Sequence, residues 1–116
     1  MKTYPIIRSD GTLRGFEIGV TFTTLRQIME ILHSADGVSS VRRTAGSDDR
    51  LQFEYDGETC VLHEPFGDNS RYWIGPAFPE NSTVDMRPLQ KVFASSDNVL
   101  EKVVRAVGVR PKSGVP

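Results

Sequence analysis

The side chains best suited to binding or chemistry are concentrated between residues 63 and 76. This stretch of fourteen residues holds one histidine, two carboxylates, one arginine and three aromatic residues. Loops carried by a rigid sheet are where binding residues usually lie, and Trp and Arg are frequent anchors of recognition surfaces. We therefore take seven residues of this stretch as the candidate binding site. They are His63, Glu64, Asp68, Asn69, Arg71, Tyr72 and Trp73.

Acid–base chemistry is one alternative for the same stretch. An imidazole beside a carboxylate is the usual general base, so a small hydrolase would use His63, Asp68 and Arg71. Ser70 is the nearest hydroxyl, but closeness in sequence is weak support for a catalytic triad. The chain holds no Gly-x-Ser-x-Gly elbow, no Gly-Lys-Ser/Thr phosphate-binding loop and no His-Glu-x-x-His string. We therefore assign no catalytic residue and favour a protein that is not an enzyme.

A metal site is a second alternative. His63, Glu64 and Asp68 offer ligand atoms, with His33 as a distant fourth. His63 and Glu64 are neighbours in a predicted strand, however, so their side chains point to opposite faces and do not readily share one ion. We predict no metal ligand and no cofactor.

The same residues also have a purely structural interpretation. In that interpretation Arg71 pairs with Glu64 or Asp68 beside a turn, as oppositely charged residues of neighbouring strands do. Either Tyr72 or Trp73 then belongs to the core, since large aromatic side chains dominate core energetics. The stretch would then position strands rather than bind a ligand.

The overall composition is that of an ordinary globular domain. The chain has 116 residues, 14 basic and 15 acidic side chains, and 38% apolar residues. Because positive charge is neither in excess nor concentrated, we expect no nucleic-acid partner. The single cysteine excludes an internal disulfide and a Cys-rich zinc site, which favours a reducing compartment. Neither the apolar run of a signal peptide nor an apolar stretch of about 18 residues occurs, so we expect a cytoplasmic protein without a membrane partner.

A strand followed by a helix is predicted in the first third of the chain. Residues 4–8 are expected to be extended, and alternation between residues 16 and 22 predicts a half-buried strand. Four apolar residues then recur with helical spacing, at Leu25, Ile28, Met29 and Leu32. This spacing predicts a helix over residues 25–35, and Thr24 with Gln27 can form a capping box at its start.

A β-hairpin around Asp56 and Gly57 is the best-defined predicted element. A two-residue Asp-Gly loop is among the strongest hairpin signals. The predicted pairs are Tyr55 with Glu58, Phe53 with Cys60 and Leu51 with Leu62. Alternation then places Leu51, Phe53, Cys60 and Leu62 on the core face and Gln52, Glu54, Val61 and His63 on the other. Cys60 is thus expected to act as a small apolar core residue rather than as a reactive thiol.

Two more strands and two helices complete the predicted elements. Residues 38–44 and 71–75 predict strands, and Pro88 suits the first turn of a helix. That helix would bury Leu89, Val92 and Phe93. Asp97 can cap a last helix. The apolar residues of that helix are Leu100, Val103, Val104 and Val107.

The order of these elements indicates an α+β fold. Strands in succession joined by short turns pair antiparallel, and segregated helices cover one side of such a sheet. We therefore predict two layers, an antiparallel sheet of four to six strands with the helices packed on one face. The element order is two strands, a helix, four strands and two helices. We expect residues 1–108 to form a single domain and residues 109–116 to be a flexible C-terminal tail.

Protein binding is the function that these observations favour. We expect a non-enzymatic interaction module that meets a protein partner through the sheet and residues 64–73. The small hydrolase is one alternative. A small-ligand binder with a pocket between sheet and helices, walled by Trp73 and Tyr72, is another. The C-terminal apolar stripe also allows a homodimer.

Overall fold

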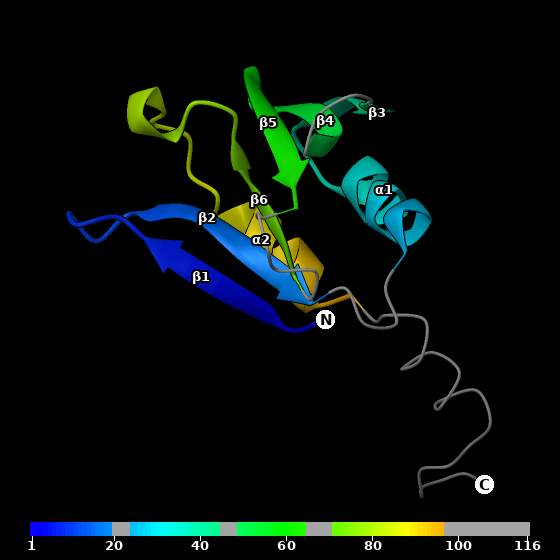
Figure 1. Ribbon diagram of the computed structural model, residues 1–116, viewed down its shortest axis with the longest axis horizontal. Coiled ribbons are helices and arrows are strands. Elements are labelled where there is room, and N and C mark those ends of the chain that lie inside the picture. Colours follow the sequence, from blue (N-terminus) through cyan, green and yellow to red (C-terminus); the bar gives the residue numbers. More distant parts are fainter. Residues whose placement is uncertain (20–23, 45–48, 65–70, 97–116) are drawn as a thin grey trace, which may run out of the picture.

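The chain folds into one six-stranded antiparallel sheet with helices packed against it. The computed structural model describes residues 1–19, 24–44, 49–64 and 71–96. Its elements are β1 (Thr3–Ile7), β2 (Leu13–Gly19), α1 (Leu25–Ser34), β3 (Val38–Arg43), β4 (Asp49–Tyr55), β5 (Glu58–His63), β6 (Arg71–Pro76), the 3-10 helix η1 (Pro79–Asn81) and α2 (Arg87–Ala94). The strand order across the sheet is β1-β2-β6-β5-β4-β3 (Figure 1). The chain therefore passes from β2 through α1 to the far edge strand, and then returns strand by strand until β6 pairs with β2.

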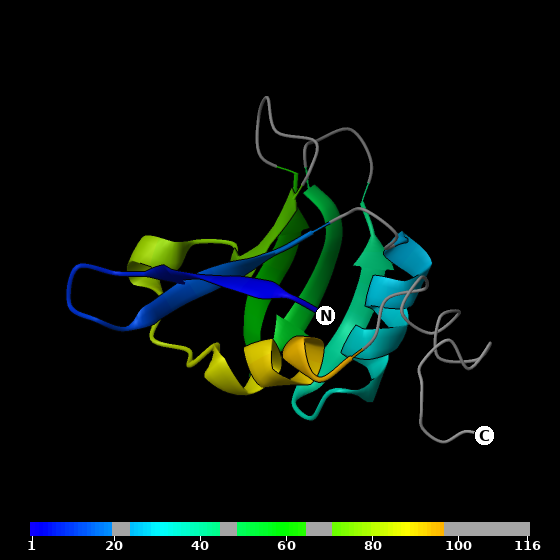
Figure 2. The ribbon, with the colours of Figure 1, turned by 90° about the horizontal axis from the view of Figure 1, so that it is seen from below.

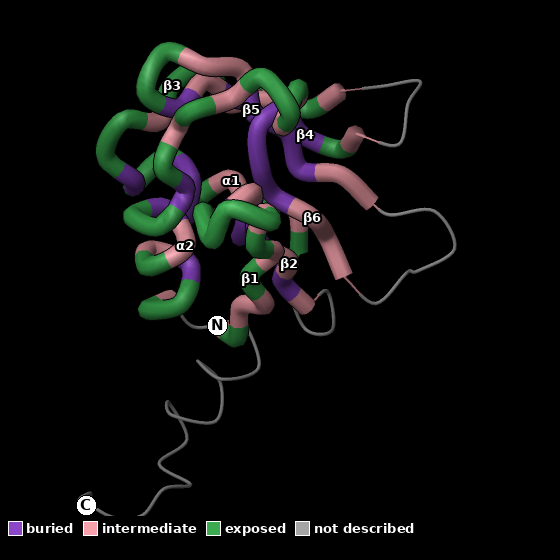
Figure 3. The backbone as a smooth tube through the Cα atoms, turned by 90° about the vertical axis from the view of Figure 1, so that its left-hand side faces the viewer, coloured by how far each residue is buried: buried purple, intermediate pink, exposed green. Residues whose placement is uncertain are grey.

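Both α-helices of the described chain pack on the same face of this sheet. Helix α1 buries Ile28 and Leu32, and α2 buries Phe93, whose ring centroid lies 5.5 Å from that of Phe16 in β2. These side chains share one core with buried residues of the four central strands, and the helices lie near one another in two views (Figure 1, Figure 2). The buried segments of β4, β5 and the helices stand out in Figure 3. The predicted two-layer α+β fold is confirmed.

Helix α1 begins and ends close to the predicted residues. Thr24 is the N-cap, and its hydroxyl accepts a hydrogen bond of 3.1 Å from the backbone N–H of Gln27. This bond satisfies one of the donors that a helix start leaves open. The helix ends at Ser34, one residue before the predicted end, and Ala35 is extended. Helix α2 likewise begins beside the predicted Pro88, while the predicted last helix and the tail lie outside the described residues.

The predicted β4–β5 hairpin is confirmed pair by pair. Asp56 and Gly57 both have positive φ, 51° and 82°, as a type I′ turn requires. All three predicted cross-strand pairs are present. The four residues placed on the core face, Leu51, Phe53, Cys60 and Leu62, are fully buried. Burial raises the pKa of the Cys60 thiol to about 12, so this side chain is an apolar core residue as expected.

Three register shifts interrupt the sheet, and two of them each insert an arginine. In β2, Gly15 is opposite Ile6 and Leu13 is opposite Ile7, so Arg14 is the extra residue. In β4 the register likewise shifts at Arg50. A bulge breaks strict alternation and redirects side chains. Because Arg14 interrupts the alternation, the sequence pattern predicts this strand only from residue 16, whereas β2 begins at Leu13.

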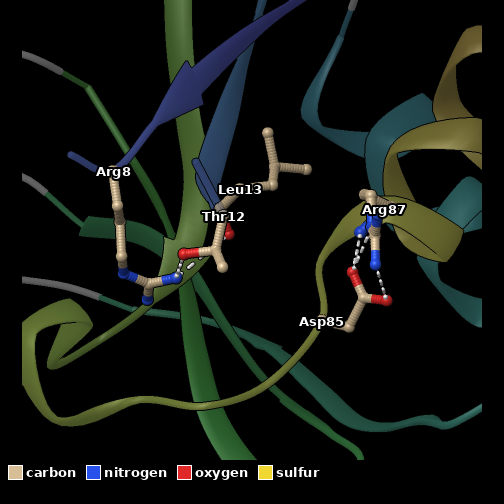
Figure 4. A network of polar contacts seen from close by, with 5 residues as sticks. All are labelled: Arg8, Thr12, Leu13, Asp85 and Arg87. Carbon is tan, nitrogen blue, oxygen red and sulfur yellow. Dashed lines mark hydrogen bonds and ion pairs between the residues drawn. The ribbon is translucent and has the colours of Figure 1, made fainter. Parts of the chain in front are cut away.

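Polar contacts fasten the segment after β6 to the β1–β2 hairpin. The Arg8 guanidinium donates to the carbonyl oxygens of Pro79, at 3.0 Å, and Ser82, at 3.4 Å, and also to Thr12. Further along, the Arg87 side chain and backbone N–H donate to Asp85 just before α2 (Figure 4). These bonds lower the pKa of the Asp85 carboxyl. Among the described residues no helix is long and apolar enough to span a membrane.

Candidate functional site

One continuous row of polar and aromatic residues crosses five strands of the sheet. The register pairs Tyr4 with Glu17, Glu17 with Trp73, Trp73 with His63, and His63 with Asp49. Alternation places these residues on the side opposite the buried neighbours Phe16, Ile18, Leu62 and Ile74. The row therefore lies on the face turned away from both α-helices, which we call the open face.

Trp73 lies flat against the backbone in the middle of the open face. A Cβ atom at Gly75 would lie 2.6 Å from the Trp73 ring, and one at Gly15 would lie 2.9 Å from it. Two glycines on neighbouring strands thus leave the recess that the indole fills. The guanidinium carbon of Arg14, the bulge residue of β2, lies 6.0 Å from the centre of the same ring. Trp73 is half-buried, and its ring packs closely against these two glycines.

Arg71 reaches across β2 toward the edge of the sheet. Its guanidinium lies 3.2 Å from a Glu17 carboxylate oxygen and 3.5 Å from the centre of the Tyr4 ring. Gly19, which is opposite Arg71, has open space where a side chain would stand. Of the two expected partners of Arg71, Glu64 contacts Arg50 instead, so that prediction is wrong. Asp68 lies outside the described residues. Because β6 pairs with β2, Arg71 contacts the carboxylate of Glu17.

His63 is paired with a carboxylate that the sequence reasoning did not select. Its Nδ1 atom lies 3.0 Å from Asp49 Oδ1, and both side chains are more than a third exposed. Continuing the hairpin register without a bulge would place Arg50 opposite His63. The extra residue in β4 brings Asp49 there instead. Arg50 contacts Glu64, with its Nη2 atom 2.6 Å from the carboxylate.

A shallow depression of about 540 Å³ opens beside Trp73. Its lining comes from five strands and the segment after β6. The lining residues are Ile6, Arg14, Glu17, Asp49, Val61, His63, Trp73, Pro76, Ala77 and Pro79. The floor is apolar, whereas the charged groups come from β2 and β4. A depression of this kind can receive a side chain, and its walls carry both signs of charge.

The predicted site residues divide into three groups in the structure. His63, Arg71 and Trp73 lie together on the open face. Tyr72 points the other way and packs against the core, so it cannot share a pocket wall with Trp73 as the small-ligand hypothesis requires. Glu64 contacts Arg50. The remaining predicted residues, Asp68 and Asn69, and the hydroxyl of Ser70, lie outside the described part of the chain.

Four residues of the site are not among the seven candidates taken from the sequence. They are Tyr4, Arg14, Glu17 and Asp49. Tyr4 and Glu17 join the site only because β6 returns to pair with β2, a contact between residues more than fifty positions apart. The other two depend on the bulges. Alternation could have placed Glu17 on a solvent face, but it carries no signal for the strand that lies next to it.

The metal site that the sequence analysis considered and did not adopt has no support in the geometry of the described residues. Within residues 1–19, 24–44, 49–64 and 71–96, no three His, Cys, Asp or Glu side chains are close enough together to hold an ion. His33 lies on α1, across the sheet from the face that carries His63. Asp68 is outside the described residues.

No known family model, curated protein or solved structure matches this chain. The open face and its side chains are therefore the basis for a functional conclusion.

Proposed function

We propose that this domain is a protein-binding module that meets its partner through the open face of the sheet. The observation that carries the proposal is Trp73, whose indole rests on the backbone at Gly15 and Gly75 beside a depression. A large aromatic side chain that is already held in one position loses little conformational freedom on binding. Such side chains are typical energetic centres of protein interfaces.

The residues around Trp73 fit the same function. Tyr, Trp and Arg are enriched at protein interfaces, and here Tyr4 and Arg71 are fixed by their mutual contact and by Glu17. The ion pair Arg71–Glu17 presents both signs of charge, and Asp49 adds a carboxylate that contacts the His63 ring. Complementary charge at a binding face fixes register and excludes wrong partners more than it adds affinity.

The edges of the sheet are poor places for strand addition, which favours the face as the docking surface. Edge strand β1 contains Pro5, which has no N–H to offer a further strand. Edge strand β3 is interrupted between Ser39 and Arg42, where Ser40 has a positive φ of 55°. Irregular backbone, proline and exposed charges are the usual protection of sheet edges.

The proposal is tested with the whole chain purified gently from its own host. A native mass spectrum should show a second polypeptide in fixed stoichiometry, which is then identified and produced separately. With that polypeptide, Trp73→Ala and Arg71→Ala should each raise the Kd by about 30-fold or more, the loss typical of interface hot spots. Arg26→Ala is the matched control, because Arg26 also pairs with a glutamate, Glu30, but does so on α1. It should leave the Kd unchanged.

Two results would overturn the proposal. One is a bare chain with no bound polypeptide in the spectrum, and the other is a partner whose affinity is indifferent to Trp73 and Arg71. A bound mass of a few hundred daltons would instead favour the small-ligand alternative. The hydrolase alternative now depends on the His63–Asp49 pair. It predicts that the unaltered chain hydrolyses an activated ester and that His63→Ala abolishes this activity.

A further inference from the structure

We infer that the open face binds a proline-rich segment of the protein partner in the polyproline II conformation. This inference rests on the proposed protein-binding function and specifies the chemistry of the segment that binds. The pyrrolidine rings of that segment pack along an apolar strip centred on Trp73, and its carbonyl oxygens face hydrogen-bond donors beside the strip.

The apolar strip runs across the sheet beside the row that holds Trp73. In the strip the register pairs Ile6 with Gly15 and Gly75 with Val61. The indole of Trp73 rests on the two glycines, so it lies between Ile6 and Val61. Both of these aliphatic side chains line the depression together with the indole. The strip therefore offers a continuous apolar floor across four strands.

The length of the strip suits an extended segment that lies across the strands. Ile6 is on β1 and Val61 is on β5, with β2 and β6 between them, so their backbones are roughly 14 Å apart. A polyproline II segment rises about 3.1 Å per residue, so about four to five of its residues span the strip. Segments of this kind dock on aromatic-lined surfaces because they are already ordered before they bind. The depression is shallow, which suits rings that lie on its floor.

The charged groups that line the depression are already engaged with one another or with neighbouring side chains. The pairs are Glu17–Arg71, Asp49–His63 and Arg14–Glu80, with 3.2, 3.0 and 3.8 Å between their closest atoms. A charged ligand side chain would have to compete with one of these pairs. A proline ring carries no charge and no donor, so it can cover the floor and leave all three pairs in place.

Two hydrogen-bond donors stand open beside the strip. The indole N–H of Trp73 donates to no group in the described part of the chain and is not buried from water, so a ligand carbonyl can reach it. The guanidinium carbon of Arg14 lies 6.0 Å from the same ring, and the Arg14 side chain is 43% exposed. The Glu17 carboxylate, in contrast, already accepts a hydrogen bond from Arg71. A proline-rich segment offers backbone carbonyl oxygens and lacks N–H groups at its prolines, so it matches these donors.

Trp73 is the single tryptophan of the chain, so intrinsic tryptophan fluorescence reports on this strip alone. The full-length protein is titrated with acetyl-hexaproline-amide. The matched probe is the same peptide made of D-proline, which has the same composition and apolar surface but winds with the opposite hand. We expect a saturable change in Trp73 emission with the L-proline peptide, with a Kd of about 1 mM. The D-proline peptide should bind at least 5-fold more weakly.

Two variants then assign the response to the strip. Ile6→Thr should weaken binding of the L-proline peptide about 4-fold or more, because apolar contact of at least one methylene group is lost. Ile7→Thr is the matched control, because Ile7 is the next residue of β1 and points to the other side of the sheet. It should leave the Kd unchanged, although Ile7 is 55% exposed. Equal binding of the two peptides, or no saturable response to either, would overturn the inference. That comparison uses the unaltered chain, so it stands even if a variant fails to fold.

The failure of this inference is distinguishable from failure of the proposed function. If the isolated partner depends on Trp73 but is not displaced by the L-proline peptide, the open face binds protein and the proline-rich ligand is wrong. If the partner is indifferent to Trp73 itself, both conclusions fail together.

Discussion

The recess under Trp73 leads to a quantitative prediction for Gly75→Ala. The new Cβ would lie 2.6 Å from two atoms of the indole and 3.2 Å from the Arg14 carbonyl oxygen. Carbon atoms in ordinary contact are about 3.5 Å or more apart, so the ring has to move by roughly 1 Å. Overpacking of this kind costs about 1–3 kcal/mol, and replacing a strand glycine returns about 0.5–1 kcal/mol. We expect a net loss of about 1–2 kcal/mol in the free energy of unfolding.

The assay is urea unfolding followed by far-UV circular dichroism, in a cycle with Trp73→Ala. Without the indole, the two closest contacts of the new Cβ disappear and only the Arg14 carbonyl oxygen remains near. Gly75→Ala should then cost less than about 0.5 kcal/mol, which gives a coupling of about 0.5 kcal/mol or more between the two positions. Gly15→Ala should stay costly in both backgrounds, because its Cβ would lie 2.7 Å from the backbone oxygen of Ile74.

Gly19→Ala is the control for strand glycines in general. A Cβ at Gly19 would meet no atom within 4 Å, so its stability should be unchanged or slightly raised. An equal cost of Gly75→Ala with and without the indole would refute the reasoning. It would mean that Trp73 does not lie on the glycines and that the open face lacks the fixed aromatic centre on which the proposed function depends.

Further predictions concern the thiol, the hairpin, the start of α2 and the open-face ion pair. Cys60 should resist Ellman's reagent at pH 8 in the folded protein and react fully in denaturant, because its pKa is raised to about 12 by burial. Gly57→Ala should lower the free energy of unfolding by about 1 kcal/mol, since φ there is 82°. The pKa of Asp85 is lowered by its bonds to Arg87, so its contribution to stability is present above the usual carboxyl pKa and lost as pH falls through the lowered value. The Tm difference between Asp85→Ala and the unaltered chain should accordingly shrink on acidification from pH 6 toward about pH 2. Arg71→Ala should change stability by about 1 kcal/mol or less in thermal unfolding, because the Arg71–Glu17 ion pair is only half-buried and water still screens it.

Local patterns were enough to predict the elements and one part of the register. The Asp56–Gly57 turn specifies which residues face one another near it, and Phe53 opposite Cys60 follows from counting outward. Helical spacing identifies α1, because apolar residues three and four apart must share one face. Among the site residues, the shared placement of His63 and Val61 on the face opposite the core follows from the same counting.

The open face itself was decided by tertiary structure. The pairing of β6 with β2 joins segments far apart in the chain, and no local signal states which strand becomes the neighbour of which. That pairing gives Arg71 its contact with Glu17 and Tyr4. The bulge at Arg50 shifts the register by one residue, so that Asp49 instead of Arg50 lies opposite His63.

The sequence by itself therefore determined the class of fold, the buried face of the hairpin and the inert character of Cys60, because each depends on residues within a few positions of one another. Only the tertiary structure decided that Trp73 lies over Gly15 and Gly75 and that carboxylates from β2 and β4 flank it. Those contacts depend on long-range strand pairing and on single-residue bulges, whose free energies come from the packing of the whole sheet rather than from any one segment.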